Sequence, residues 1–207
     1  FMREAMKEAV KAFEIGEGSE VLLQAFTCVA VPNSVLWAGA KPVYVDIDNS
    51  LNLDPDNLLK KITPRSKAVI VQHTFGIPAQ MEKILAIAQK HHLLVIEDCA
   101  HSLGVSYHGR KLGNWGDAAF FSFGRDKVVS SVFGGMAIIS EKYKVKSTKL
   151  RKYQEKLPYP SSSWIFQQLF HPLAFSVILA SYNIGLGKIL LWLLQRLHLL
   201  SLPVYPQ

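Results

Sequence analysis

Short apolar runs rich in β-branched residues alternate along this chain with segments of helical periodicity. Runs of this kind, bounded by polar and turn residues, are typical of buried strands, and their alternation with helices favours a parallel sheet. We therefore predict an α/β domain with a mostly parallel central sheet flanked by helices. The predicted strands lie at 20–24, 42–47, 67–72, 93–98, 118–123 and 135–140.

Apolar positions in one intervening segment follow the spacing of a helix. The i, i+3, i+4, i+7 pattern is filled by Met81, Ile84, Leu85 and Ala88. It predicts a helix over 79–92 with one face on the sheet. The segment DPDNLLKKI predicts a second, shorter helix, because Asp54 is suited to cap its N-terminus and Pro55 to occupy its first position.

The two ends of the sequence differ from its middle. Residues 1–20, FMREAMKEAVKAFEIGEGSE, are charged throughout and amphipathic, which indicates a helix and not a signal peptide. The sequence starts with Phe and stops at PVYPQ after a hydrophobic run. We therefore expect it to be a piece of a longer protein.

Composition narrows the class of protein and its partners. The 207 residues are 49% hydrophobic and 19% charged, which suits one globular domain with a sizeable core and an appendage. The net charge of +7 favours an anionic partner such as a nucleotide, a phosphate or an acidic lipid surface. Nucleic acid is not expected, because no basic run is interleaved with aromatics. Cys28 and Cys99 lack the spacing of a disulfide framework or a zinc site, which fits a reducing cytoplasm.

Candidate chemistry begins with Asp98, which follows an apolar strand in VIEDCAH. In open α/β sheets ligands bind beyond the carboxyl ends of the strands, although a helix-capping role explains this one position equally well. Lys127 lies in FSFGRDKVVSSVFGG, between an aromatic run and the pair Gly134 and Gly135. An ordinary solvated turn is the alternative for this lysine.

If Asp98 and Lys127 lie at the ends of neighbouring strands, they form the pair that pyridoxal 5'-phosphate requires. The lysine amine bonds to the cofactor aldehyde, and the carboxylate keeps the pyridine nitrogen protonated. Ser122 is placed to donate to the cofactor phosphate, and His101 to reach the ring hydroxyl. The glycine pair lets the chain approach the cofactor and re-enter the sheet. Each residue alone has a structural alternative, and only the ordered set indicates this cofactor.

Three blocks of the sequence resemble a known family over roughly residues 15–150. They are GEGSEVLLQAFTCVAVPNSVLWAGAKPVYVDID, ITPRSKAVIVQHTFGIPAQM and LLVIEDCAHSLGVSYHGRKLGNWGDAAFFSFGRDKVVSSVFGGM. The chain looks like the DegT/StrS family of pyridoxal-phosphate-dependent nucleotide-sugar aminotransferases. The resemblance implies a fold type I large domain over 1–156 and a homodimer. It also implies amino transfer, commonly from glutamate, to a keto-sugar carried on a nucleoside diphosphate, in cell-surface polysaccharide or amino-sugar biosynthesis.

The resemblance also implies roles for individual residues. Lys127 matches the lysine that bonds to the cofactor, and Asp98 the aspartate that pairs with the pyridine nitrogen. His101 matches a His or Gln near the ring hydroxyl, and Ser122 a phosphate ligand. Asn33 matches an asparagine common in the motif, with a polar residue inside a helix as its alternative.

The chain departs from the family pattern at a few places. Cys28 stands where many members have an aromatic ring that stacks on the cofactor, so that contact is expected to be weaker or to come from elsewhere. Phe133 replaces an acidic residue, and Gly124 replaces a His or Gln. The Gly-Thr phosphate loop of the family would precede residue 1.

The last part of the chain, 157–207, is a hydrophobic helical segment. From Leu157 to Gly187 there is no Asp, Glu, Lys or Arg. Buried helices of a larger enzyme, an interfacial membrane hairpin and a true span all fit, since a span needs roughly 20 apolar residues. We favour the interfacial hairpin, at the inner face of the membrane. Its interface anchors would be Trp164, Trp192, Lys188 and Arg196.

Two other functions compete with the aminotransferase. One is a non-catalytic regulatory or scaffold protein that keeps the fold. The other is a membrane-associated assembly subunit in which 157–200 is the functional part. Visible absorbance of the bound cofactor would separate the enzyme from both.

Overall fold

The protein is described by a computed structural model, which covers residues 13–124, 127–130, 134–156 and 159–200. Contacts divide the chain into an α/β unit, residues 1–155, and a C-terminal unit, residues 156–207. We describe each unit by itself. The departure expected at Phe133 lies outside the described residues.

The α/β unit is built on a six-stranded sheet in the order β2-β1-β3-β4-β7-β8. The first five strands in this order are parallel, and β8 runs antiparallel to β7. This confirms the predicted mostly parallel sheet, with strand ends shifted by no more than two residues. The strands are β1 Glu20–Gln24, β2 Lys41–Val45, β3 Ser66–Gln72, β4 Leu94–Asp98, β7 Ala118–Ser122 and β8 Gly135–Ile139. A small antiparallel pair, β5 Ser106–Tyr107 and β6 Arg110–Lys111, was not predicted.

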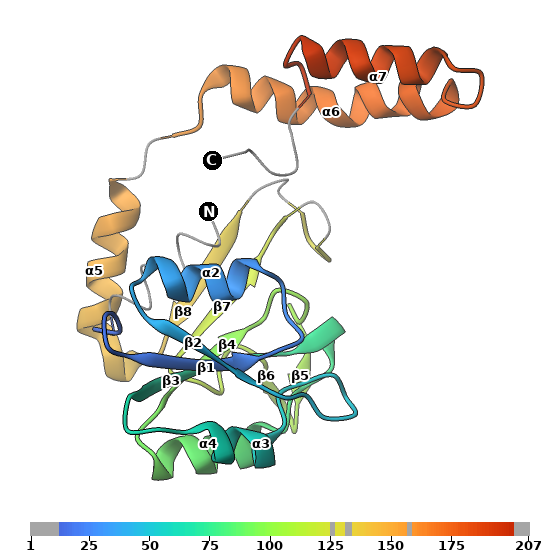
Figure 1. Ribbon diagram of the computed structural model, residues 1–207. Helices are drawn as coiled ribbons and strands as arrows, with labels where there is room; N and C mark the ends of the chain where they lie inside the picture. Colours follow the sequence, from blue (N-terminus) through green and yellow to red (C-terminus); the bar gives the residue numbers. More distant parts are fainter. Residues whose placement is uncertain (1–12, 125–126, 131–133, 157–158, 201–207) are drawn as a thin grey trace. The chain divides into compact units, whose positions relative to one another are not determined.

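Helices cover both faces of this sheet (Figure 1). On one face lie α2, Ala30–Trp37, and α5, Lys144–Glu155. On the other face lie α3, Pro55–Lys61, and α4, Met81–Lys90. The predicted flanking helices are therefore confirmed, although α4 is shorter than the range 79–92.

Local signals explain where some of these helices begin. The Asp54 side chain accepts a hydrogen bond from the Asp56 N–H at 2.9 Å, and Pro55 occupies the first position of α3, as predicted. Helix α2 was anticipated only through the structural alternative for Asn33, because AVPNSVLW contains residues of low helix propensity. Residues 1–12 lie outside the described part, and 13–19 form turns and loops. The predicted N-terminal helix therefore does not extend to residue 20.

The core has two layers, one on each face of the sheet. Strand residues alternate between the faces, so Ile96 packs on the α2 side and Val95 on the α3 and α4 side. The α2 layer also contains Val31, Val35, Val21, Leu23, Ile70 and Phe120. The opposite layer contains Leu58, Met81, Ile84, Ala88, Leu22 and Val69. Residues 97 and 98 consequently point to opposite sides of the sheet.

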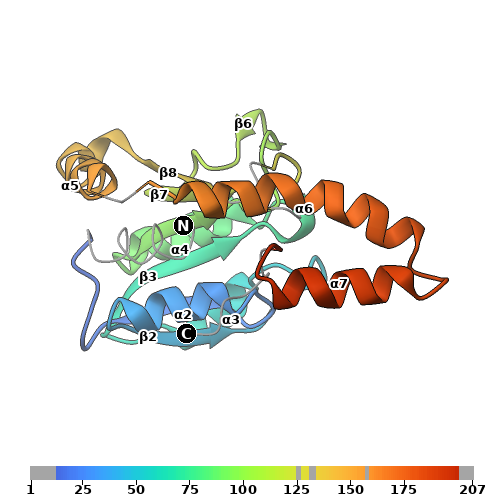
Figure 2. The same cartoon turned by 90° about the horizontal axis from the view of Figure 1, so that it is seen from above.

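The C-terminal unit is a helical hairpin. Helices α6, Ser162–Ala180, and α7, Leu186–Arg196, run antiparallel and side by side (Figures 1 and 2). Ala174 and Ile178 pack against Leu194 between them. Gly187 permits the close approach, because a Cβ there would lie 2.2 Å from the Ile178 carbonyl oxygen. Among the described residues, α6 is the one helix long and apolar enough to cross a membrane.

Candidate active site

Asp98 ends β4 in the middle of the sheet. Strand register places it beside Gln72 of β3 and Phe120 of β7, and its side chain is 3% exposed. Its Oδ1 accepts a hydrogen bond from the Ala100 N–H at 3.0 Å. Burial raises the pKa of Asp98, against the opposing effects of this bond and of His101, His73 and Lys127. A turn and no helix follows Asp98, so the helix-capping alternative is wrong.

Lys127 reaches back to the segment after β4. Its Nζ lies 3.1 Å from His101 Nε2, and both residues are half-buried. The Lys127 N–H donates to the Gly124 carbonyl at 3.1 Å, so a turn is present, as the alternative for this lysine required. The side chain is nevertheless directed into the site. In the described residues, the buried Nδ1 of His101 has no hydrogen-bond partner.

Ser122 lies on the same face of the sheet as Asp98. It follows Phe120 by two residues in β7, and strand residues two apart share a face. Its Oγ accepts from the Gly124 N–H at 3.5 Å. The chain then returns to the sheet, because the Phe123 N–H donates to the Gly134 carbonyl at 3.0 Å and β8 starts at Gly135. The re-entry predicted for the glycine pair is thus observed.

Cys28 lies just before α2 and Asn33 lies within it. Cys28 is an exposed free cysteine just before α2. Asn33 is half-buried inside α2, which agrees with its structural alternative. Within the described part, no hydrogen bond joins either residue to Asp98, His101 or Ser122. Contact of Cys28 or Asn33 with a cofactor therefore remains a prediction.

Phe75 is a site residue that the sequence did not reveal. It lies in the turn Thr74–Gly76 after β3, with a left-handed φ of 53°, which is uncommon for a bulky residue. Its ring stacks on the His101 imidazole at a centroid distance of 5.8 Å and an interplanar angle of 14°. Phe26 packs edge-on against it at 6.3 Å. Phe75 therefore holds one face of the imidazole that contacts Lys127.

A buried polar network fixes the turn that carries Phe75. The Gln24 side-chain amide donates to Thr74 Oγ1 at 3.0 Å, and the Thr74 hydroxyl donates to the Leu51 carbonyl at 2.9 Å. The Thr74 N–H donates to Asn52 Oδ1 at 2.8 Å. Buried groups that are hydrogen-bonded in this way define one conformation, because an alternative turn would leave them unpaired.

Glu97, next to Asp98, is enclosed by donors. Its Oε1 accepts from the N–H groups of Trp115 and Gly116, each at 2.7 Å, and its Oε2 from the Gly113 N–H at 2.8 Å. His73 Nε2 lies 3.2 Å from Oε2. Burial alone would raise the pKa of Glu97, but these hydrogen bonds outweigh it and lower the pKa. Glu97 therefore stays ionised inside the fold.

The tautomer of His73 follows from its two neighbours. Its Nδ1 accepts from the Ala79 N–H at 3.2 Å, so the proton lies on Nε2 and is donated to Glu97. Cys99 is close to both side chains, and the three atoms lie within 4.8 Å of one another. The nitrogens of His73 and the oxygens of Glu97 are already used, so this cluster holds the fold together and is not arranged for a metal ion.

The cluster at the end of β4 fits pyridoxal phosphate. Asp98 is buried, and among the described residues one hydrogen bond reaches its side chain, so an N–H⁺ group of the pyridine ring would supply a further donor and a charge. Lys127 Nζ provides the amine. His101 provides a buried nitrogen in need of a partner. The residues present therefore suit this cofactor.

A mostly parallel sheet with a lysine, a histidine and a buried aspartate beyond the ends of its strands is the arrangement expected of an α/β aminotransferase domain. Residues 3–156 match the DegT/DnrJ/EryC1/StrS aminotransferase family, and the chain belongs to this family. The family expected from the sequence is confirmed.

Relatives and solved structures agree with this assignment. UDP-N-acetyl-3-dehydro-alpha-D-glucosamine 3-aminotransferase of Acidithiobacillus ferrooxidans is 41% identical over 140 residues, which cover 67% of this chain and 38% of that protein. The X-ray structure of an aminotransferase from Psychrobacter cryohalolentis has a TM-score of 0.71 at 34% identity, over 74% of this chain and 39% of that one. The chain therefore spans well under half of each. These neighbours confirm the predicted fold type I.

A third similar protein bears on the cofactor. Spr1654 of Streptococcus pneumoniae has been solved in a PLP form and a PMP form, each with a TM-score of 0.69 at 25% identity. Each match covers 74% of this chain and 43% of the Spr1654 chain. The family and these two forms indicate pyridoxal phosphate as the cofactor.

Proposed function

We propose that the protein containing this chain transfers an amino group from an amino acid to a keto-sugar carried on a nucleotide. We propose glutamate as the donor, and cell-surface polysaccharide or amino-sugar biosynthesis as the setting. Membership of the aminotransferase family and the nucleotide-sugar relative support this reaction class.

The single observation that carries the proposal is the meeting of Lys127, His101 and Asp98 at one edge of the sheet. When bound, pyridoxal phosphate supplies an electron sink that accepts and then returns the amino group. Asp98 would hold the ring nitrogen protonated, and Ser122 would bind the phosphate.

Lys127 would move the proton during the transfer. Its Nζ lies 3.1 Å from His101 Nε2, so the imidazole would orient the amine for this proton transfer. Cys28 and Asn33 would line the approach from α2. A lysine at this position also disfavours the dehydratase branch of the family, which has a histidine there.

The test is covalent labelling of the full-length protein. We expect the purified protein to be yellow, and borohydride to fix the cofactor on the peptide that contains Lys127. The Lys127→Arg variant should lose both colour and label. Lys111→Arg should keep both, because Lys111 is exposed and donates to the Gly104 carbonyl. A label on another lysine, or no label, contradicts the site.

The assembly in the proposal is a homodimer whose two copies complete each other's sites through an isologous interface. The family resemblance supports this arrangement. Light scattering on the active full-length protein tests it, and a strictly monomeric active enzyme would refute it.

The place of action in the proposal is the cytoplasmic face of a membrane, which 157–200 would contact. The apolar hairpin within 157–200, which contains no Asp or Glu, supports this location. The competing function is a regulatory or scaffold protein that keeps the fold without the chemistry. A full-length protein that is folded but colourless, with no label on Lys127, would favour this competitor.

A further inference from the structure

The outer face of α6 is an exposed apolar row. Phe166, Leu169, Leu173 and Val177 recur at helical spacing and are 55%, 68%, 68% and 58% exposed. Ala174 and Ile178 lie about 100° further round the helix and pack in the contact with α7. A contiguous apolar stripe on the exposed side of a helix is normally covered by protein or lipid. We call these four exposed residues the α6 row, and we expect it to be covered by protein or lipid.

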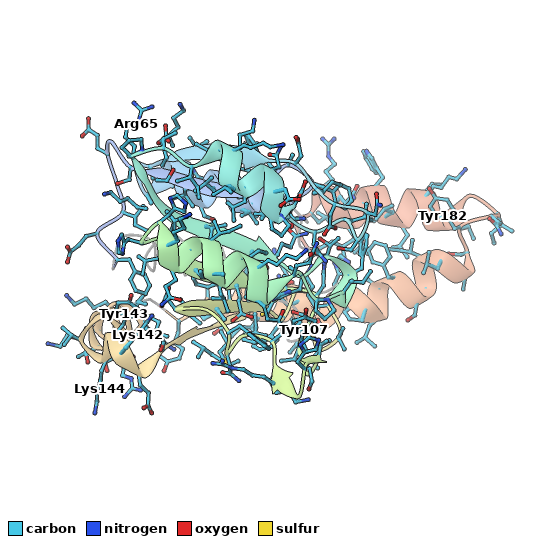
Figure 3. All side chains as sticks on the ribbon, turned by 90° about the horizontal axis from the view of Figure 1, so that it is seen from below. Arg65, Tyr107, Lys142, Tyr143, Lys144 and Tyr182 are labelled. Atoms are coloured by element: carbon cyan, nitrogen blue, oxygen red, sulfur yellow. The ribbon has the colours of Figure 1, made fainter. Side chains whose placement is uncertain are left out.

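The exposed face of α7 is mixed, because cations lie beside the exposed apolar residues Leu186, Ile189, Leu193 and Leu197. Lys188, Trp192 and Arg196 recur at i, i+4 and i+8 and form the cationic row. Arg196 lies 5.4 Å from the Trp192 ring, and Lys188 lies 5.4 Å from the ring of Tyr182. Figure 3 shows Tyr182 near the turn of the hairpin. Cations paired with Trp and Tyr are typical of helices at the headgroup level of a bilayer.

The sequence around the hairpin strengthens the charge argument. From Leu157 to Gln207 there is no Asp or Glu, so nothing in this segment can neutralise the cationic row. Directly before the hairpin, residues 142–156 contain seven Lys or Arg and a single acid, Glu155. A polybasic segment next to an apolar helix is the sequence pattern of proteins that bind anionic lipids.

We propose that the α6–α7 hairpin lies flat on an anionic lipid surface. The α6 row would be immersed among the acyl chains, and the cationic row would lie at the headgroups. This inference deepens the proposed membrane location and is independent of the proposed chemistry at Lys127.

Two other membrane arrangements fit the hairpin less well. Insertion of the turn first would carry Asn183 and Lys188 into the hydrocarbon, where a charged side chain is expensive. A double span fails on length, because α7 has 11 residues and a span needs roughly 20. The flat arrangement keeps Lys188 and Arg196 at the same depth, at the level of the headgroups.

The first experiment is vesicle flotation of the full-length protein with phosphatidylcholine vesicles, with and without phosphatidylserine. We expect binding that needs phosphatidylserine and weakens with salt. The double variant Lys188→Glu/Arg196→Glu should bind at least about thirtyfold more weakly. The matched control Lys67→Glu/Lys83→Glu makes the same charge change at exposed positions of the α/β unit and should bind like the wild type.

The second experiment measures depth with a nitroxide label on single cysteines. In a Cys28→Ser background, labels at Leu173→Cys, Ile184→Cys and Gln195→Cys report α6, the turn and α7. We expect the label on α6 to be deepest and the label on α7 to be most accessible to a water-soluble relaxation agent. A label that is deepest at the turn overturns the flat arrangement in favour of insertion.

A third measurement separates lipid from protein as the cover. Full-length Leu169→Glu/Leu173→Glu should stay folded and dimeric in solution but lose vesicle binding. If this variant unfolds, or if its light-scattering mass falls, the α6 row is covered by protein and the proposal is wrong. A wild type that fails to float also overturns it, whatever the colour and labelling of Lys127 show about the amino transfer.

Discussion

Glu97 and Asp98 are adjacent carboxylates at the end of one strand, and they have different roles. Glu97 stabilises the fold, whereas Asp98 belongs to the candidate active site. Glu97 faces the α3 and α4 side, where three backbone N–H groups and His73 enclose it and lower its pKa. Asp98 faces the α2 side, where the described part of the chain offers it one N–H donor, and burial raises its pKa. A fully paired buried acid stabilises the fold, whereas an underpaired one destabilises it until a partner binds.

The difference teaches that burial alone does not identify a functional acid. Glu97 and Asp98 are 0% and 3% exposed, so exposure cannot separate them. The two residues differ instead in the number of hydrogen bonds that each carboxylate accepts. Variants of the two residues should therefore affect different quantities, and the following predictions test that separation.

The largest effect is expected at Asp98. Asp98→Asn should leave the cofactor bound but reduce amino transfer by a factor on the order of 1000 or more, because an unprotonated pyridine is a poor electron sink. Stopped-flow absorbance and steady-state rates of the full-length protein measure this. Activity within a few-fold of the wild type would mean that Asp98 has no role at the ring nitrogen.

The next effect is expected in the stability of Glu97 variants. Glu97→Gln replaces an acceptor by an NH₂ group that faces backbone donors, so the free energy of unfolding should fall by about 3 kcal/mol. Urea unfolding measures the change, with the exposed Glu141→Gln as the control. If both variants unfold at the same urea concentration, the four contacts contribute little.

A smaller effect is expected in the pH dependence of stability. The pKa of Glu97 is lower in the folded protein than its ordinary value of 4.5, so its contribution is complete above that pH and is lost as the pH falls through the folded value. The gap in unfolding free energy between wild type and Glu97→Gln should therefore narrow below pH 4.5. A gap that stays constant with pH would exclude ionisation as its source.

Ionisation of Asp98 should change the stability of the fold in the opposite direction. Its folded pKa is raised above 3.8, so the proton is bound more tightly in the folded state and stability is lost as the pH rises through the folded value. Without cofactor, Asp98→Asn should therefore be more stable than the wild type at neutral pH, as thermal unfolding of the two apoproteins would show. A less stable variant would mean that Asp98, like Glu97, serves the fold.

The smallest effect is expected at Phe75. Phe75→Leu keeps an apolar side chain but removes the ring that stacks on His101, so amino transfer should fall a few-fold while dimer mass and cofactor binding persist. The cofactor absorbance should also shift with pH over a wider range, because the imidazole is held less firmly. Phe26→Leu, which touches Phe75 but not His101, is the matched control.

The sequence predicted the sheet and part of the cluster because both have local signatures. The six strands of the main sheet are compact apolar runs, and Asp98 and Lys127 stand out as charges beside such runs. The stacking of Phe75 and the donors around Glu97 depend on tertiary structure. Backbone N–H groups at 113–116 have no side-chain signature, and nothing in HTFG indicates a phenylalanine with a left-handed backbone.

The order of the strands has a consequence for how this protein is made. Strand β1 is buried at all five residues and pairs on one side with β2 and on the other with β3. The pairing of Glu20 with Ser66 therefore cannot form until the ribosome has synthesised β3. During synthesis the second edge of β1 stays open until β3 has left the ribosome, and long-range parallel pairing is slow. The nascent chain therefore exposes an apolar strand edge over that interval, and its yield in cells should depend on chaperones that shield such edges.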